Sequence, residues 1–470
     1  MQASIFNIRV PLKDRNDVFL MNTLTDAQLV VSPDVAALLD RAAFDDLTEN
    51  EREAVDLLSE NGFFVPDYES DRRNLDDYFH RIKYSGHELH ITVLTTLQCN
   101  FACGYCYQGD REDFNQFAEK MTLDTSARIA AWIEQELDRV RPETFAMTFF
   151  GGEPLLNLPV VYDLAERTWA ATRARGIKQT LSIITNGLLL TEDVVDRLGP
   201  RGLRGIKITL DGDRDTHDHM RPLRGGQGTF DRIIENIRRV AHRTNISIGG
   251  NFDETSADSF PALLDFLAAQ DFADKLVKVN FKPIVRDRPA PAPSLKGMLP
   301  LIPVSTSGKP LGGTCMTSTG GGGGSTCDSC SFLDEKMAFL REETRRHNLP
   351  GPNGVPGGPC HVHHKNAHTI GPDGSLYACP GFTGEKAMST GHISGHIDGW
   401  REQNKRKFDT LDPWKECGDC AYLPVCAGGC LTASYSQLGD VNTPTCHKPT
   451  FESAVIALAH RAGAHEETVQ

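Results

Sequence analysis

Apolar runs of strand length alternate with amphipathic segments of helix length from about residue 89 to residue 285. The segment 123–140 shows the helical pattern, because Ile129, Ile133 and Leu137 recur on one face. Such alternation is typical of parallel sheets whose strands are joined by helices. We therefore predict an α/β fold, a partial (β/α)6 barrel with its chemistry at the C-terminal ends of the strands. The predicted strands cover residues 90–96, 145–152, 180–187, 205–212, 247–253 and 277–284.

The first 75 residues follow a different pattern. Short apolar runs at residues 4–10, 18–24 and 28–31 predict three strands. Ser32 followed by Pro33 predicts a helix start, and a second, Thr-capped helix is expected within residues 47–65. Three strands with a few helices indicate a winged-helix-like unit over residues 1–75.

The chain loses its regular alternation after the predicted barrel, which spans residues 88–285. Residues 286–350 are rich in Gly and Pro, and no strand or GK[ST] motif flanks the glycine run, so a linker is favoured over a phosphate-binding loop. Residues 351–470 are turn-rich and contain seven cysteines between Cys360 and Cys446. Metal ligation is therefore the expected source of stability in this last unit.

Composition narrows the classes of function. The 470 residues carry a net charge of −14 without a basic stripe, so we expect no nucleic-acid partner. No apolar run is long enough to cross a membrane, and the first residues lack a signal-peptide pattern, so we expect no membrane partner and a cytoplasmic location. In a reducing compartment the 13 cysteines indicate metal or redox chemistry rather than disulfides.

Two motifs follow the first two predicted barrel strands. Cys99, Cys103 and Cys106 form a C-x3-C-x2-C group that could converge on one metal centre, although a zinc site or scattered thiols would give the same letters. The second motif, GGEP at residues 151–154, has two glycines that allow close backbone approach and a Glu that suits an ammonium group. Alone, GGEP could be a simple turn between strand and helix.

Together, CNFACGYC (99–106), GGEP (151–154), SIITNG (182–187) and KITLDG (207–212) resemble the radical S-adenosylmethionine (SAM) superfamily, whose fold is a partial TIM-like barrel. The resemblance implies a [4Fe-4S] cluster on Cys99, Cys103 and Cys106, with SAM chelating the fourth iron. It implies reductive cleavage of SAM to a 5′-deoxyadenosyl radical that abstracts hydrogen from a substrate. The residues that would contact SAM are Gly151, Gly152 and Glu153, at its ammonium group, and Ser182, Asn186 and Thr209.

The cysteines of the last unit resemble the SPASM domain, which carries two auxiliary [4Fe-4S] clusters, giving three clusters in all. The resemblance implies one full ligand set and one set of three, although a zinc ribbon is an alternative. Cys315, Cys327 or Cys330 could supply the missing fourth ligand, or the iron could stay open. The full set is Cys417, Cys420, Cys426 and Cys446, and the set of three is Cys360, Cys379 and Cys430.

Histidines near these motifs are left without a role. The run CHVHHKNAH (360–368) is more typical of solvated surface or of donors around a cluster than of a separate metal site. His217 and Arg221 fall where the superfamily often has His and Arg, and a salt bridge at a helix start explains them equally well.

SPASM enzymes mostly modify peptides or proteins, and an electron donor such as flavodoxin or ferredoxin is implied. Pro380 follows Cys379 where sulfatase maturases have Asp, which disfavours that activity. The first 75 residues resemble the PqqD-like element that binds leader peptides by adding a strand, although a packing subdomain without a partner would show the same pattern. We predict a maturase of a ribosomal precursor peptide that installs a cross-link, with a thioether favoured over C–C or C–O links or oxidation. A protein-oxidising dehydrogenase and a non-enzymatic metal-binding regulator are the alternatives.

Overall fold

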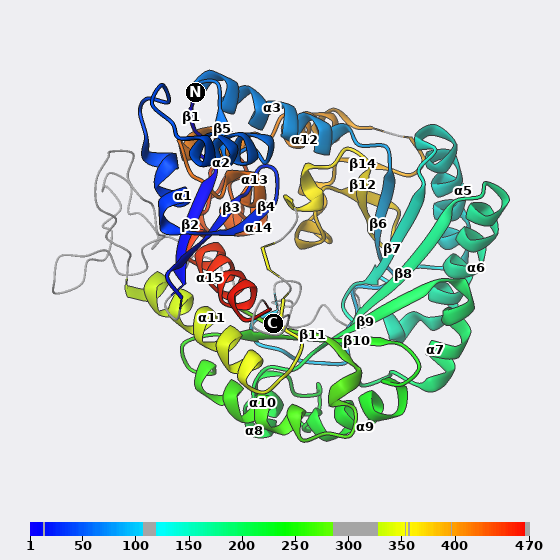
Figure 1. Ribbon diagram of the computed structural model, residues 1–470. Helices are drawn as coiled ribbons and strands as arrows, with labels where there is room; N and C mark the ends of the chain where they lie inside the picture. The colour runs from blue at the N-terminus through cyan, green and yellow to red at the C-terminus, as the bar shows by residue number, and fades with distance from the viewer. Residues whose placement is uncertain are drawn as a thin grey trace, which may run out of the picture.

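A computed structural model describes residues 1–12, 15–106, 119–284, 328–352, 354–355, 358–395 and 397–465. Its largest sheet has nine strands in the order β11-β10-β9-β8-β7-β6-β12-β13-β14. The strands β6 to β11 run parallel and are joined by helices that cover the outside of a curved sheet (Figure 1). The predicted α/β partial barrel is confirmed.

The predicted helix over residues 123–140 is helix α5, Leu123–Val140, with Thr122 as its N-cap. The predicted strand 145–152 ends earlier, at Phe150, because Gly151 has a φ of 140° and turns the chain. The remaining barrel elements are β6 (Glu88–Leu94), β7 (Thr144–Phe150), α6 (Leu158–Ala174), β8 (Lys178–Thr185), α7 (Glu192–Leu198), β9 (Leu203–Thr209), α8 (Arg214–Met220), α9 (Phe230–Val240), β10 (Asn245–Phe252), α10 (Phe260–Ala268) and β11 (Leu276–Pro283).

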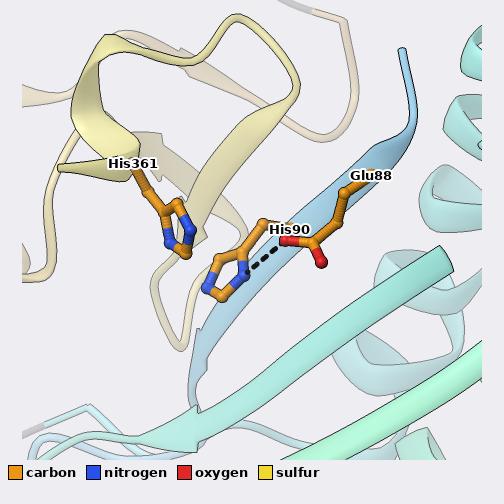
Figure 2. Close-up of side chains that lie close together, drawn as sticks. All are labelled: Glu88, His90 and His361. Atoms are coloured by element: carbon orange, nitrogen blue, oxygen red, sulfur yellow. Dashed lines mark ion pairs between the residues drawn. The ribbon is translucent and has the colours of Figure 1, made fainter. Parts of the chain in front are cut away.

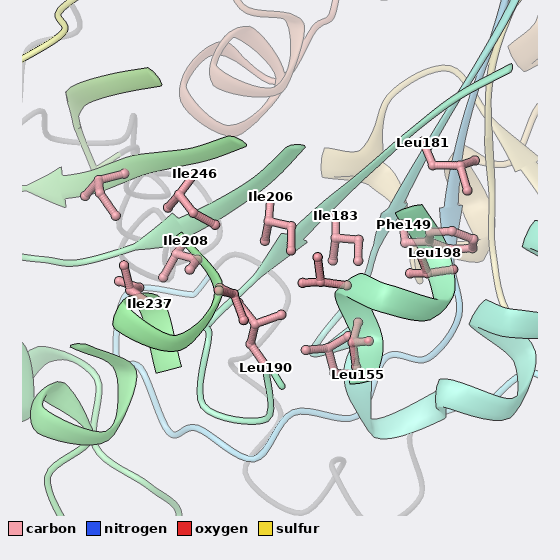
Figure 3. Packing of buried hydrophobic residues seen from close by; sticks show 14 of the residues in the cluster. Phe149, Leu155, Leu181, Ile183, Leu190, Leu198, Ile206, Ile208, Ile237 and Ile246 are labelled. Carbon is pink, nitrogen blue, oxygen red and sulfur yellow. The ribbon is translucent and has the colours of Figure 1, made fainter. Parts of the chain in front are cut away.

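Alternation of side chains along each strand positions the barrel core. Every second residue of β7, Phe145, Met147 and Phe149, is buried, and the residues between them face the barrel interior. Figure 3 shows how Ile183, Ile206 and their neighbours meet the outer helices in the same way. The helices thus cover the outer face of the sheet, and its inner face carries the smaller and polar side chains.

The sheet continues beyond the predicted barrel. β12 (Ala367–Ile370) pairs in parallel with β6, and β13 (Ser375–Tyr377) and β14 (Gly391–His392) extend the sheet in antiparallel order. The C-terminal segment therefore covers the edge of the first barrel strand. Local sequence patterns do not predict this extension, because β12 is short and overlaps the histidine run.

That histidine run is less exposed than solvated surface would be. His363 is buried and His368 is half-buried, whereas His361 remains exposed. Burial arises because β12 lies against β6 and because the ring of His368 meets the edge of Trp132 on α5, with ring centroids 5.4 Å apart.

The N-terminal residues form a three-stranded antiparallel sheet of β2 (Asn7–Leu12), β3 (Asp17–Asn22) and β4 (Ala27–Val31). Leu20 points into a cluster with the nearby helices, and Phe19 and Met21 point to the other face. The other elements of this unit are β1 (Gln2–Ala3), α1 (Pro33–Ala37), α2 (Glu49–Glu60, capped by Thr48), β5 (Phe64–Val65) and α3 (Tyr68–Tyr84).

This N-terminal unit is docked on the cysteine-rich segment. Phe19 and Met21 pack in one cluster with Tyr422 and Val425, and the ring of Phe79 stacks on Trp414 with centroids 4.2 Å apart. Helix α15 packs against both β2 and α11. It therefore links the N-terminal unit to the helix that precedes the cysteine-rich segment (Figure 1). The C-terminal helices are α11 (Asp328–Arg346), α12 (Gly399–Asp409), α13 (Leu423–Cys426), α14 (Leu431–Leu438) and α15 (Lys448–His465).

Candidate functional site

The C-x3-C-x2-C loop begins five residues after the end of β6, and the GGEP turn holds its first part in place. The backbone N–H of Gly152 donates to the carbonyl of Thr96 at 2.9 Å, and the N–H of Glu153 donates to Gln98 at 2.8 Å. Two neighbouring strand ends are thereby joined through their backbones. The structure thus brings the two motifs together at the C-terminal edge of the barrel.

Both glycines of GGEP are required by this backbone contact. A Cβ atom at Gly151 would lie 2.2 Å from the carbonyl oxygen of Thr96, and one at Gly152 would lie 2.2 Å from that of Gln98. The backbone at Thr96 and Gln98 cannot move aside as the end of a flexible side chain can. Any larger residue at either glycine would therefore displace the start of the cysteine loop. Close approach was predicted for a ligand, and here the neighbour is the chain itself.

Glu153 is fully buried, and its carboxylate already has three donors. Oε1 accepts hydrogen bonds from the N–H of Leu155 at 2.9 Å and the hydroxyl of Thr185 at 2.8 Å, and Oε2 accepts from the N–H of Asn186 at 2.8 Å. Burial raises the pKa of Glu153, and these hydrogen bonds oppose the rise. The side chain therefore ties the end of β8 to the GGEP turn; its predicted contact with an ammonium group stays a prediction.

The other residues predicted to contact SAM lie on adjacent strands. The hydroxyls of Ser182 on β8 and Thr148 on β7 are 2.9 Å apart, on the inner face of the barrel. The side-chain amide of Asn186 donates to Asn100 Oδ1 at 2.7 Å and thus contacts the cysteine loop directly. Thr209 is the last residue of β9 and is half-buried. All three lie at or near the edge that carries the cysteines.

Cys99, Cys103 and Cys106 fit a shared metal centre chemically. Burial raises the pKa of the Cys99 thiol to about 12 and that of Cys103 to about 11, and neighbouring thiols of the group add to both shifts. The Arg221 guanidinium partly opposes the rise at Cys103, and bound iron would supply further positive charge to the thiolates. The N–H of Phe101 also points to the Cys99 sulfur, at 3.4 Å. This donor set suits a [4Fe-4S] cluster.

A buried polar network beside the cysteines was not anticipated. The hydroxyl of Tyr105 lies between Asp211, to which it is hydrogen-bonded, and Arg221, whose Nη1 donates to it at 2.5 Å. Arg221 and Asp211 also form an ion pair at 3.4 Å, with 11% and 0% of their side chains exposed. The network joins the cysteine loop to the ends of β9 and β10, since Asp211 also accepts from the N–H of Asn251 at 2.7 Å.

The ring of His217 is hydrogen-bonded to the same network. Burial lowers the pKa of His217 well below its ordinary value, and the neutral ring accepts the N–H of Asp211 on Nδ1 at 3.1 Å. Its Nε2 lies 3.1 Å from the hydroxyl of Thr229. The interpretation of Arg221 as an ion-pairing residue is thus correct, but its partner is Asp211 in the buried site and not a residue of a helix start. Only the DG turn after β9 hinted at Asp211.

The seven C-terminal cysteines fall into two neighbourhoods. The pKa of Cys379 rises to about 11 through burial, with added contributions from the thiols of Cys360 and Cys430. Burial likewise raises the pKa of Cys426 to about 12, and the thiols that add to it are Cys417, Cys420 and Cys446. The structure thus brings together the same two sets that the SPASM resemblance implies.

These groups are wider than a single-ion site. In the described part of the chain, no three cysteine sulfurs lie within 4.8 Å of one another. Ligands of one zinc ion would be closer, because Zn–S bonds are about 2.3 Å long. Cubane ligands bind different irons and can lie farther apart, so this arrangement is compatible with clusters, and the zinc ribbon stays the alternative. Cys315 and Cys327 lie outside the described residues, and of Cys330 only its place in α11 is described.

The inner face of the barrel is basic along one side. Lys207 on β9 lies over Gly249, and Lys282 and Lys278 on β11 are close enough to repel it. Lys207 is accessible to solvent in this interior, and loss of hydration among the surrounding residues, followed by these two charges, lowers its pKa to about 8. An anionic group would be favoured in this part of the interior.

One family model matches most of the barrel. Residues 93–266 match the Radical SAM superfamily. Among curated proteins, 156 residues are 32% identical to GTP 3′,8-cyclase of Xanthomonas campestris pv. campestris, over 32% of this chain and 40% of that protein. A stretch of 191 residues is 27% identical to Fe-coproporphyrin III synthase of Methanosarcina barkeri, over 40% of this chain and 43% of that protein. The chain spans half or less of the length of these relatives.

Solved structures extend the likeness beyond the barrel. The structure titled native anSMEcpe with bound AdoMet has a TM-score of 0.56 and 17% identity, over 79% of this chain and 99% of that one. A second structure of anSMEcpe, with AdoMet and the Cp18Cys peptide, has a TM-score of 0.55 and 16% identity, over 80% and 99%. At this identity the likeness shows a shared fold.

Across the described helices, none combines the length and apolar character needed to span a bilayer.

Proposed function

We propose that this chain, which contains a radical SAM domain, modifies a ribosomally made precursor peptide and installs a cross-link, with a thioether favoured. The observation that carries the proposal is the set of three thiols, Cys360, Cys379 and Cys430, gathered apart from the four-cysteine set. A three-cysteine site leaves one iron of a cubane for a substrate sulfur. The known binding of a peptide by anSMEcpe, which shares the fold, is in keeping with a peptide substrate.

Each group of residues would have a separate role. Cys99, Cys103 and Cys106 would hold the cluster that binds SAM, and the two C-terminal sets would hold the auxiliary clusters. When bound, these groups supply the hydrogen-abstracting radical and an acceptor for the electron released as sulfur joins carbon. The GGEP turn orients the cysteine loop, and Tyr105 with Arg221 fixes the loop from the other side.

The edge of the N-terminal sheet supports recognition of an extended peptide. Both faces of this sheet are covered, by the clusters around Leu20 and around Phe19 and Met21. Within the described chain β4 pairs with β3 alone, so its outer backbone groups are available for another strand. Strand addition at β4 would present the peptide beside the cysteine-rich segment on which the sheet is docked.

The activity is tested by anaerobic reconstitution of the full chain with iron and sulfide. We expect about twelve irons per chain, as three [4Fe-4S] clusters require, and release of 5′-deoxyadenosine that depends on SAM and dithionite. Fewer than about eight irons would contradict three clusters. Bound zinc without SAM cleavage would instead support the metal-binding regulator.

The part of the three-cysteine set is tested with Cys430→Ala. We expect this variant to keep cleaving SAM, because Cys430 belongs to a different ligand set from Cys99, Cys103 and Cys106. We expect it to lose at least about 90% of cross-linked peptide. Both are measured in one reaction, by chromatography of 5′-deoxyadenosine and by mass spectrometry of a peptide from a neighbouring reading frame. Cross-linking at the wild-type rate would remove the cluster from the mechanism.

The same mass spectra distinguish the dehydrogenase alternative. A thioether consumes a substrate thiol, which then resists alkylation, and the ring suppresses fragment ions between the linked residues. A protein-oxidising enzyme would remove two hydrogens from a Ser or Cys side chain without forming a ring. Acceptance of a folded protein rather than the peptide would favour that alternative.

A further inference from the structure

Three potential metal ligands meet at a place that the cysteine sites do not use. Glu88 and His90 lie two residues apart on β6 and therefore share a face, and His361, at the start of a short helix, places its ring next to that of His90 (Figure 2). One donor atom from each residue lies within 4.8 Å of the other two. The side chains come from segments far apart in sequence, so the fold itself brings them together.

His90 has an imidazole nitrogen that the surrounding protein leaves unsatisfied. Its Nδ1 is buried and has no hydrogen-bond partner among the described residues. The nearest carboxylate oxygen, of Glu88, is 3.6 Å away, which is too long for a hydrogen bond. On its other side the His361 ring lies against it, with centroids 4.0 Å apart. A buried nitrogen facing a carboxylate and a second imidazole is suited to a cation between them.

We propose that Glu88, His90 and His361 bind a divalent first-row transition metal ion, with zinc as the representative of the class. Two imidazoles and one carboxylate form a ligand set that such ions accept, and three protein ligands leave a fourth position for water. Calcium and magnesium are disfavoured because they prefer oxygen ligands. A rearrangement of side chains alone would complete the site, since Glu88 and His361 are both exposed.

The position of the site indicates what the metal does. Glu88 and His90 lie at the N-terminal end of β6, and Cys99 follows its C-terminal end, so the ion would lie away from the radical chemistry. His361 directly follows Cys360, and the backbone N–H of His90 donates to Asn366 at 2.9 Å. A bound ion would therefore fasten the segment that carries Cys360 to the first barrel strand.

The test uses Zn²⁺ itself on full-length chain already loaded with iron and sulfide, so that the cysteine sites are filled. Zinc affinity is measured by competition with a chelator, and the zinc ligands by X-ray absorption. We expect one zinc per chain with nitrogen and oxygen neighbours at about 2.0–2.1 Å, in contrast to about 2.3 Å for sulfur. We also expect the midpoint of thermal unfolding to rise with zinc.

Two variants and a control assign the ligands. His90→Gln is expected to weaken zinc binding at least about 100-fold, and Glu88→Gln, a surface change that spares folding, by about 10-fold or more. His87→Gln makes the same chemical change three residues away at an exposed side chain and should bind zinc as the wild type does. No zinc on the iron-loaded chain, a sulfur shell, or unchanged affinity in both variants would show that the two rings only pack. These readouts do not depend on SAM cleavage or on the peptide.

Discussion

Replacing Gly152 by alanine is expected to lower 5′-deoxyadenosine formation at least about 100-fold, because displacement of reacting groups by about 1 Å commonly has an effect of this size. The new methyl group would lie 2.2 Å from the carbonyl oxygen of Gln98, next to Cys99. Relief of the clash requires separating the GGEP turn from the cysteine loop. That separation breaks the hydrogen bonds that Gly152 and Glu153 donate to Thr96 and Gln98.

Gly104→Ala provides the matched control for this prediction. Gly104 lies between Cys103 and Cys106, and among the described residues a Cβ atom there would meet nothing within 4 Å. The control should therefore bind iron and cleave SAM like the wild type. Iron content and 5′-deoxyadenosine are measured for both variants after the same reconstitution. If Gly152→Ala retained wild-type activity, the turn would have no part in placing the cysteines.

The sequence located this edge of the barrel because its signals are local. Hydrophobic alternation predicts β6 to β11, and the cysteine spacing and GGEP follow the strand ends directly. The same letters could not reveal that Glu153 would be enclosed by donors from Leu155, Thr185 and Asn186. Thr185 is the last residue of β8 and Asn186 follows it, so the assignment needs the packed sheet.

Long-range pairing explains the other differences. β12 is four residues long, and its partner β6 precedes it by more than 270 residues, so no local periodicity could predict the pair. The same pairing leaves His368 half-buried and brings His361 beside His90. A run of histidines that appeared to be surface thus became part of the contact between the barrel and the cysteine-rich segment.

The buried ion pair of Arg221 and Asp211 leads to the second large effect. Arg221→Met is expected to reduce local stability at the ends of β9 and β10 by about 3–5 kcal/mol, because Asp211 would remain buried without its counter-charge. Asp211→Asn should also destabilise, by leaving Arg221 buried and unpaired. Native-state hydrogen exchange of peptides that cover β9 and β10 reports the local free energy of opening.

The double variant Arg221→Met/Asp211→Asn separates the pair from the packing around it. Removing both charges abolishes the unpaired state, so we expect the double variant to lose at least about 2 kcal/mol less than the sum of the two single losses. Additive losses would mean that the two side chains act independently and that Arg221 contributes mainly through its packing over Phe101. The hydroxyl of Tyr105 is hydrogen-bonded to both residues. Coupling between Arg221 and Asp211 would therefore also affect how firmly the cysteine loop is held at the ends of β9 and β10.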